Sequence, residues 1–364
     1  MTDRPSGPSS APRPDAGPAR PDAARPAGSV LERSGLVIVD KPAGMTSHDV
    51  VSRLRRLFRT KRVGHAGTLD PDATGVLVVG VERGTKFLAH LVRDDKRYTA
   101  DIAFGTTTVT DDAAGEVLTR ATPEALAAVT EERIRTAFSH QVGEIMQRPS
   151  SVSSVKVDGR RAHELVREGR EVTLPARPVT VHALDVTAVA DGAAAPVPTA
   201  SVAVHCSSGT FIRAIARDVG GELGVGGHVT ALRRTAVGPF GIDGARTLDA
   251  LEAEVRAGEE RGGEDSTADG PGSPGAGPAT AAGPAAAPVP ALSLTLDEAV
   301  VRSFPVREIS DAEGADLSLG KWLRPVGMRG VYAAVTPSGR AVALVRERGD
   351  RAASVFVVRP HGLS

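Results

Sequence analysis

The stretch GHAGTLDPDATGVL, residues 64–77, places two carboxylates and a histidine in a loop with three glycines and a proline. Asp70 and Asp72 flank Pro71, and backbone alternation would direct their side chains apart, so they are not expected to form an acid–base pair. One interpretation is structural, because an Asp before Pro often accepts a hydrogen bond from a backbone N–H two residues on. The other is chemical: Pro71 stiffens the loop, and the apolar run behind it gives one reactive carboxylate a rigid support.

The stretch GVERGTK, residues 80–86, resembles a phosphate-binding loop but lacks its spacing. Its glycines are one residue too close together for GxxxxGK[ST], and Lys86 is followed by Phe87. The single cysteine, Cys206, cannot form an internal disulfide, and no Cys and His residues have the sequence spacing of zinc ligands. His205 beside Cys206 is most simply part of a strand. The sequence therefore predicts neither a nucleotide cofactor nor a metal.

Apolar runs and helical periodicities alternate irregularly along the chain, and several strands follow one another directly. This order favours an α+β fold with a mixed, largely antiparallel sheet flanked by helices, rather than a doubly wound parallel sheet. Ser47 is the expected N-cap of the first helix, and Thr122 is expected to cap a helix that starts at Pro123. Strands are expected at 35–42, 75–81, 97–105, 153–159, 178–189, 200–206 and 228–240. Helices are expected at 49–58, from 84, and at 123–138, 161–169 and 208–224.

Two segments, residues 1–33 and 258–290, are rich in proline, alanine and glycine and lack apolar periodicity. Neither can bury enough apolar surface to offset its ordering entropy, so both are expected to be disordered. They delimit a domain at 34–257 and a small β-rich module at 293–364 on a flexible tether. No run of about 18 apolar residues occurs and no secretory signal is evident, so a soluble, cytoplasmic protein is expected.

The chain has 44 basic and 44 acidic residues and no net charge, but its basic residues are unevenly placed. RLRRLFRTKR, residues 53–62, holds six basic residues and no acid, and residues 321–359 hold eight against Glu347 and Asp350. Two basic patches on a neutral chain predict a surface that follows a phosphate backbone. The alternative is that both are ordinary solvated faces of helices and strands.

Six blocks in a fixed order, rather than any single motif, point to a family. They are GLVIVDKPAGMTSHDVVSRLRR, RVGHAGTLDPDATGVLVVGVERGTKF, KRYTADIAFGTTT, RPSSVSSVKVDGRRAHELVREG, CSSGTFIRAIARDVG and GGHVTALRRTAVGPF. Over roughly residues 34–242 the chain resembles the TruB family of tRNA pseudouridine synthases. Residues 293–364 more loosely resemble a PUA-type domain, a small β-barrel that helps to hold tRNA in that family. The resemblance implies the pseudouridine synthase fold.

The resemblance also implies a reaction, the isomerisation of the uridine at position 55 in the T-loop of tRNA without metal or organic cofactor. The family's catalytic aspartate falls on Asp70, whereas Asp72 matches no catalytic position. The carboxylate would attack the ribose C1′, add to C6 of the uracil or abstract a proton from the ribose, and all three steps remain open. The family's arginine falls on Arg213, where it would keep the carboxylate ionised. On the residues alone, Arg213 is equally a surface helix residue.

A uridine in a folded T-loop must be extruded to react, and the resemblance implies residues that would receive it. Tyr98 matches the family's stacking tyrosine, His65 a residue that fills the space left by the flipped nucleotides, and Leu232 a position lining the uracil pocket. On the residues alone, Tyr98 is equally a strand tyrosine and His65 a side chain bonded to a loop carbonyl. Phe211 stands where many members have tyrosine, so it can pack against the base without donating a hydrogen bond. Two further common tyrosine positions are occupied by Val152 and His163.

Lys41, Lys86 and the basic segment 53–62 are candidate phosphate contacts, which would fix the position of the RNA rather than read its sequence. The expected partner is the T-arm stem–loop of tRNA, with no membrane contact, no obligate protein partner and a monomeric chain. A guide-RNA-dependent synthase subunit and an RNA-binding or RNA-folding protein without catalysis remain alternatives. A glycoside or nucleoside hydrolase is disfavoured, because no second carboxylate lies in a matching motif.

Overall fold

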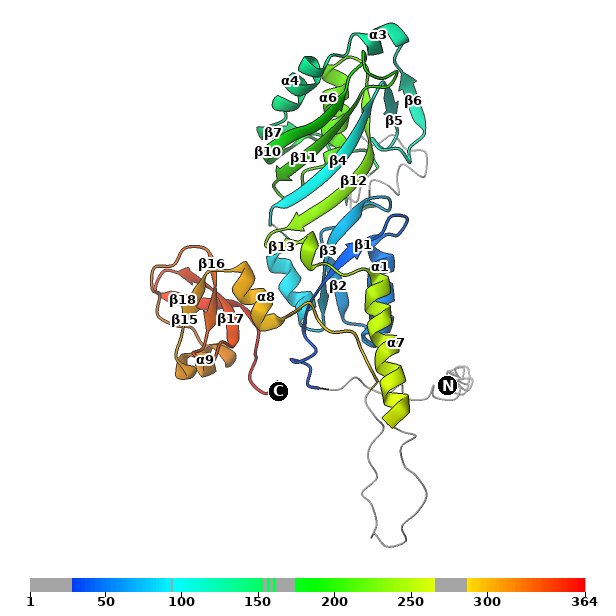
Figure 1. Ribbon diagram of the computed structural model, residues 1–364. Helices are drawn as coiled ribbons and strands as arrows, with labels where there is room; N and C mark the ends of the chain where they lie inside the picture. Colours follow the sequence, from blue (N-terminus) through cyan, green and yellow to red (C-terminus); the bar gives the residue numbers. More distant parts are fainter. Residues whose placement is uncertain are drawn as a thin grey trace, which may run out of the picture.

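One mixed sheet of ten strands runs through the larger part of the chain (Figure 1). The computed structural model describes residues 28–92, 94–152, 174–265 and 287–363, with the short segments 156–157 and 160–161. Across the sheet the strands are β14 (Leu294–Thr295), β1 (Gly35–Lys41), β3 (Thr74–Val81), β12 (Gly227–Val237), β4 (Lys96–Phe104), β11 (Thr199–Cys206), β10 (Arg177–Ala190) and β7 (Gly143–Gln147). Paired with this series are β2 (Val63–Ala66), next to β3, and β13 (Phe240–Gly241), next to β12. Among the strand pairs described in this sheet, only β3–β12 is parallel, so the expected α+β fold with a largely antiparallel mixed sheet is confirmed.

Strand β3 shows why its sequence is an uninterrupted apolar run: it is buried on both faces. Val76 and Val78 belong to one hydrophobic core, and Leu77 and Val79 to another. The second core is closed by helices α1 (Ser47–Leu57) and α7 (Leu248–Asp265). The strand that follows the Asp70 loop is therefore held firmly from both sides.

A third core lies under helices α4 (Glu131–Ser139) and α6 (Ile212–Glu222), which pack on β4, β10, β11 and β12. The single helix expected at 123–138 is two helices, α3 (Pro123–Ala127) and α4. Thr122 caps α3 as expected, but Thr130 then starts α4 by accepting a hydrogen bond from the Arg133 N–H. A second capping residue thus interrupts the periodicity.

Helix α1 begins two residues before the expected start at 49, and its N-cap is Thr46 rather than the expected Ser47. Thr46 and Asp49 form a reciprocal capping box, in which each side chain accepts from the other residue's backbone N–H. Ser47 lies inside the first turn and is buried. Its hydroxyl is therefore free to bond elsewhere, as described below.

Helix α7 runs to Asp265, so the expected boundary at 257 and disorder from 258 are wrong for its last turns. The helix is held partly by the basic segment 53–62: Arg53 forms a bidentate ion pair with Glu252, and Arg59 Nη2 lies 3.4 Å from Glu259 Oε1. These acids neutralise part of the surface that was expected to contact phosphates.

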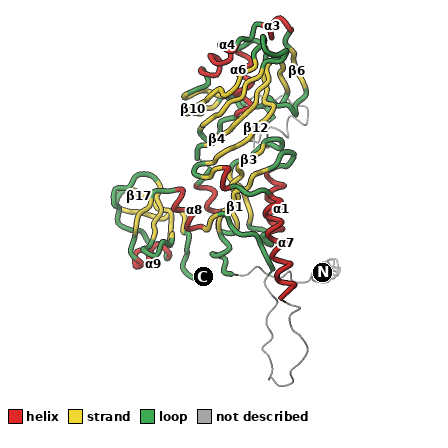
Figure 2. The backbone as a smooth tube through the Cα atoms, in the orientation of Figure 1, coloured by secondary structure: helices red, strands yellow, loops and turns green. Residues whose placement is uncertain are grey.

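The C-terminal module has a four-stranded sheet of its own, as expected from its β-rich sequence. Its elements are α8 (Leu296–Ser303), β15 (Val306–Glu308), α9 (Asp311–Ser318), β16 (Val331–Val335), β17 (Ala341–Arg348) and β18 (Arg351–Val357). Figure 2 shows this sheet beside the larger unit, with α8 between them.

The C-terminal module packs directly on the larger unit, and residues 266–286 of the expected tether lie outside the described residues. Leu296 and Val300 of α8, together with Leu344 of β17, share one core with Ile38 and Phe87 of the larger unit. Before α8 the chain adds β14 to the edge of β1, where Leu36 pairs with Leu294. The two units therefore form a continuous hydrophobic contact.

The remaining described elements are short. They are α2 (Gly84–Phe87), the 3-10 helices η1 (Leu88–His90) and η2 (Ile242–Gly244), β5 (Thr106–Thr108), β6 (Val117–Arg120), β8 (Lys156–Val157) and β9 (Arg160–Arg161). Residues 162–169 of the helix expected at 161–169, the position of His163, and most of the segments expected to be disordered (1–27 and 266–286) lie outside the described residues, whereas Arg161 lies in β9. Among the described helices, none combines the length and apolar character needed to cross a membrane.

Candidate active site

The loop that carries Asp70 connects β2 to β3 and is held by donors from three separate elements. Arg234 of β12, 1 % exposed, donates to the carbonyl oxygens of Gly67 and Thr68 at 2.9 and 3.4 Å. The Ser47 hydroxyl of α1 accepts from the Leu69 N–H at 3.0 Å and lies 3.2 Å from the Leu69 carbonyl oxygen. The backbone on the N-terminal side of Asp70 is thus fixed by buried side chains.

Lys41, at the end of β1, fixes the other side of the loop. Its Nζ donates to the carbonyl oxygens of Pro71, Pro42 and Met45 at 2.8, 2.8 and 2.7 Å, and the residue is fully buried. Burial lowers the pKa of Lys41 to about 8, although the carboxylates of Asp72 and Asp70 oppose this shift. Contrary to the sequence-based expectation, Lys41 is not available to a phosphate; it is a positioning group.

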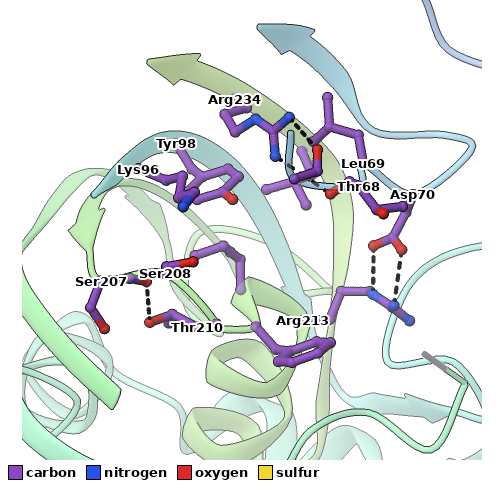
Figure 3. A pocket seen from close by; sticks show the side chains of 15 residues that line it. Thr68, Leu69, Asp70, Lys96, Tyr98, Ser207, Ser208, Thr210, Arg213 and Arg234 are labelled. Carbon is purple, nitrogen blue, oxygen red and sulfur yellow. Dashed lines mark hydrogen bonds and ion pairs between the residues drawn. The ribbon is translucent and has the colours of Figure 1, made fainter. Parts of the chain in front are cut away.

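Asp70 faces Arg213 in a bidentate ion pair (Figure 3). Arg213 Nε lies 2.9 Å from Asp70 Oδ2, and Nη2 lies 3.2 Å from Oδ1. The Arg213 side chain is only 6 % exposed, whereas the Asp70 side chain is 41 % exposed. The fork geometry therefore fixes the orientation of the carboxylate while leaving it open to a ligand.

The guanidinium of Arg213 is itself held in place by several acceptors. It donates to the carbonyl oxygens of Thr110 and Val152, and its Nη1 lies 3.4 Å from Asp112 Oδ2. At the start of α6, Gln147 holds the preceding residue, Phe211: its side-chain amide accepts from the Phe211 N–H at 2.8 Å and donates to the Phe211 carbonyl at 3.1 Å. The arginine has little freedom to move away from Asp70.

A pocket opens beside this ion pair, between the Asp70 loop, β4, β12 and the start of α6 (Figure 3). Tyr98, Phe211 and Leu232 supply apolar surface to it, and Ser207 and Ser208 supply hydroxyls. Burial raises the pKa of the Tyr98 phenol, so this hydroxyl stays neutral at ordinary pH. The pocket combines flat apolar surface, neutral hydroxyls and one fixed carboxylate.

Two buried cations also line the pocket. Lys96 is 6 % exposed and donates to the Val92 carbonyl at 3.0 Å, and burial, followed by repulsion from Arg234, lowers its pKa. The Arg234 guanidinium donates hydrogen bonds to backbone carbonyl oxygens, including that of Val76 at 2.8 Å. The positive charges of Lys96, Arg213 and Arg234 outnumber the one negative charge of Asp70 in the pocket lining, so the pocket favours an electron-rich ligand.

The chain is 58 % identical over 339 residues to the protein named tRNA pseudouridine synthase B of Corynebacterium jeikeium, in a match that covers 93 % of this chain and 99 % of that one. The chain belongs to the TruB family of pseudouridine synthases. Family models agree: TruB family pseudouridylate synthase (N-terminal domain) matches residues 55–212, tRNA pseudouridylate synthase B C-terminal domain matches 213–268, and tRNA pseudouridine synthase II, C-terminal, matches 304–359. This TruB-family protein is accordingly an isomerase.

Other similar proteins agree with this membership. The protein named tRNA pseudouridine synthase B of Corynebacterium diphtheriae is 53 % identical over 333 residues, covering 92 % of this chain and 99 % of that one. A solved Cbf5-Nop10-Gar1 complex contains a chain with a TM-score of 0.64 and 23 % identity, covering 95 % of this chain and 92 % of that chain. An H/ACA RNP bound to a substrate RNA gives a TM-score of 0.63 and 22 % identity, covering 95 % and 93 %. At this identity the solved structures show a shared fold.

In this TruB-family fold, five of the predicted residues line one pocket: Asp70, Tyr98, Phe211, Arg213 and Leu232. Two others lie apart from it. His65, on β2, packs edge-on against His48 with ring centroids 5.5 Å apart. Lys86 is exposed on α2, beyond the end of β3 opposite the Asp70 loop.

Sequence reasoning missed the residues that position the TruB-family site, namely Ser47, Lys96, Gln147 and Arg234. Lys96 and Arg234 lie in the sequence segments KRYTA and TALRRTAVG, and nothing in these segments indicates that the two side chains are buried. Burial of Lys or Arg without a local acidic partner in sequence is rare and depends on backbone acceptors supplied by the fold. Gln147 offered no motif, because its partner is the backbone of Phe211.

Proposed function

We propose that this enzyme converts uridine 55 in the T-loop of tRNA to pseudouridine, with Asp70 as the reacting carboxylate. The observation that carries the proposal is the ion pair of Asp70 and Arg213, which presents one oriented carboxylate to an otherwise cationic and apolar pocket. The relatives named tRNA pseudouridine synthase B support tRNA as the substrate.

The reaction is an isomerisation, so no atom is gained or lost. The bond between uracil N1 and ribose C1′ breaks, the base turns over in place, and a bond forms between C5 and C1′. The proton lost from C5 is balanced by the one gained at N1. A carboxylate can assist by attacking C1′, by adding to C6 or by taking a proton from the ribose, and each step needs it to be ionised and correctly aimed. The bidentate contact with Arg213 fixes the direction in which the carboxylate points.

The pocket walls fit a flat, uncharged base. Tyr98 and Phe211 are aromatic, and Leu232 adds an aliphatic surface beside them. Extruding a base costs a few kcal/mol of lost stacking, and stacking on an aromatic side chain returns about 1–3 kcal/mol. The enclosed walls would keep the base near Asp70 while it is detached from the ribose.

Binding of the RNA backbone is assigned to exposed basic residues outside the pocket. Lys86 remains a proposed phosphate contact, because it is exposed. The C-terminal module adds Arg351, whose guanidinium lies over the ring of the half-exposed Trp322 at 5.0 Å. Such contacts would position the tRNA without reading its sequence.

The test compares Asp70→Asn with Asp72→Asn, a matched carboxylate two residues away that is exposed. Each purified protein is incubated with a T-arm stem–loop, pseudouridine is mapped at single-nucleotide resolution, and RNA affinity is measured separately. Asp70→Asn should form no pseudouridine yet bind the RNA, whereas Asp72→Asn should stay active. Normal turnover by Asp70→Asn would refute the catalytic assignment.

The same assay distinguishes the two alternatives. A guide-RNA-dependent subunit would be inactive as a purified chain without added RNA and proteins. A binding protein without catalysis would bind the stem–loop but leave its uridines unchanged. Modification at position 55 by the purified chain alone contradicts both.

A further inference from the structure

Two histidines and an aspartate that play no part in the proposed reaction converge on one point beside the pocket. His182 Nε2 lies 3.3 Å from Asp95 Oδ2, and His205 Nε2 lies 3.6 Å from the same oxygen. One possible ligand atom from each of the three residues lies within 4.8 Å of the other two, and the imidazole ring centroids are 4.9 Å apart. We call Asp95, His182 and His205 the histidine cluster.

The sheet, and not the local sequence, brings the histidine cluster together. His205 is on β11 and His182 is on the neighbouring strand β10, while Asp95 immediately precedes β4 on the other side of β11. The register of β10 with β11 shifts between Val181 and Ala183, which places His182 in a β-bulge. Bulges turn a side chain out of the regular alternation, and here the bulge directs His182 towards its neighbour.

We propose that the histidine cluster binds a divalent transition metal ion of the zinc class. In a tetrahedral site with ligand bonds of about 2.0–2.2 Å, neighbouring ligand atoms are about 3.4 Å apart. The two separations from Asp95 Oδ2 to the histidine nitrogens, 3.3 and 3.6 Å, lie on either side of this value. Two imidazoles and one carboxylate are a donor set that suits zinc, with a fourth position left to water.

A purely hydrogen-bonded arrangement explains the cluster less well. The separation of 3.6 Å between His205 Nε2 and Asp95 Oδ2 is too long for a hydrogen bond. The side chains are 33 to 47 % exposed, so an ion can reach them from solvent. The hollow beside His205 also contains Asp94, Arg97 and Arg302. The two acids and two arginines there balance in charge. The affinity for a metal ion would therefore come from bonds to the ligand atoms rather than from a negative electrostatic potential.

The position of the cluster indicates what a bound ion would do. Asp95 precedes Lys96, and His205 lies two residues before Ser207; both Lys96 and Ser207 line the pocket. The turn before β4 is tied to the pocket by the Ser208 hydroxyl, which donates to the Val92 carbonyl at 2.7 Å. An ion joining Asp95 to β10 and β11 would fasten this turn to the sheet. It would stabilise the pocket wall without touching the RNA base.

The test uses the full-length protein without a histidine tag, first treated with a chelator and then titrated with zinc chloride in a calorimeter. His182→Ala, His205→Ala and Asp95→Asn each remove one ligand. His140→Ala is the matched control, since His140 Nδ1 also meets a carboxylate, Glu222 Oε1, at 2.8 Å. Thermal unfolding in the chelator checks that every variant is folded, and the absorption spectrum with cobalt(II) reports whether the ion is four-coordinate.

The wild-type protein and His140→Ala should bind one zinc ion and unfold at a higher temperature when it is present. Each cluster variant should bind zinc more weakly by on the order of ten-fold or more and lose the thermal shift. No zinc binding by the wild-type protein would overturn the proposal, and so would equal binding by the cluster variants. Both results are independent of which RNA the enzyme modifies.

Discussion

Arg234 and Gly75 lie opposite each other where β12 and β3 run parallel, and a Cβ on Gly75 would come within 2.1 Å of the Arg234 carbonyl oxygen. Gly75 has a φ of 100°, a conformation that disfavours other residues. This close approach lets the Arg234 side chain reach Gly67 and Thr68 on the loop that carries Asp70. The orientation of the proposed reacting carboxylate therefore depends on the close strand packing that Gly75 allows.

The first prediction concerns this contact. Gly75→Ala should lower the free energy of unfolding by about 2 kcal/mol or more, because it adds both backbone strain and a steric clash. The control is Gly64→Ala on β2, where the nearest atoms to an added Cβ are 3.9 Å away. Urea unfolding measures both changes. Equal stability of the two variants would contradict the role assigned to the close approach.

The second prediction concerns the fork geometry of Arg213. Arg213→Lys keeps the charge but cannot donate from two nitrogens to both Asp70 oxygens, so kcat should fall on the order of 100-fold. Arg217→Lys, one helical turn further along α6 and paired with Asp111 at 3.2 Å, should lose far less activity. Single-turnover rates on a T-arm stem–loop give the comparison. If both lysine variants were equally active, orientation by Arg213 would not matter.

The third prediction separates the ring of Tyr98 from its hydroxyl. Tyr98→Leu removes an aromatic surface from the pocket wall and should lose about 1–3 kcal/mol of stabilisation of the extruded base. Tyr98→Phe keeps that surface and should bind RNA like the wild-type protein. Any rate that Tyr98→Phe loses is then due to the hydroxyl. Identical behaviour of the Leu and Phe variants would rule out stacking by this ring.

The fourth prediction is a pH dependence of stability that originates at His65. Burial, with smaller contributions from His48 and Arg234, lowers the pKa of His65 to about 4, against an ordinary value of 6.5. Between these values the unfolded chain takes up a proton that the native protein does not. This group therefore contributes stability above pH 6.5 that is lost as the pH falls towards 4.

Because His65→Asn lacks this titration, its free energy of unfolding should fall less than that of the wild-type protein between about pH 7 and about pH 4.5. The difference should be on the order of 1–3 kcal/mol. The exposed His361 supplies the control variant, His361→Asn. An unchanged pH profile in His65→Asn would show that His65 titrates normally in the folded protein.

Local patterns predicted much of the fold. Apolar runs such as GVLVVGV marked buried strands, and Thr122 before Pro123 marked a helix start. The loop around Asp70 was recognised from its glycines and proline, and Arg213, Tyr98, Phe211 and Leu232 followed from the resemblance. The structure adds that these side chains share one pocket.

What the sequence could not predict depends on contacts between distant elements. Lys41 appeared to be a surface lysine because no local feature shows that three backbone carbonyls surround its ammonium group. The last turns of α7 appeared too polar and glycine-rich to be ordered, and their order depends partly on Arg59 in the basic segment. His182 and His205 met only through a bulge, which periodicity does not reveal.

The contacts between α7 and the segment before β14 have a consequence for insertions into this enzyme. Arg246 and Glu254 bind the backbone of Ala291, and Ser293 accepts a hydrogen bond from the Ile38 N–H, so the chain is anchored before β14 begins. The two ends of the connection between Asp265 and this anchor are therefore fixed to the same body. Because loop-closure entropy grows only slowly with length, an affinity tag or a fluorescent domain inserted there should leave the geometry of both units intact.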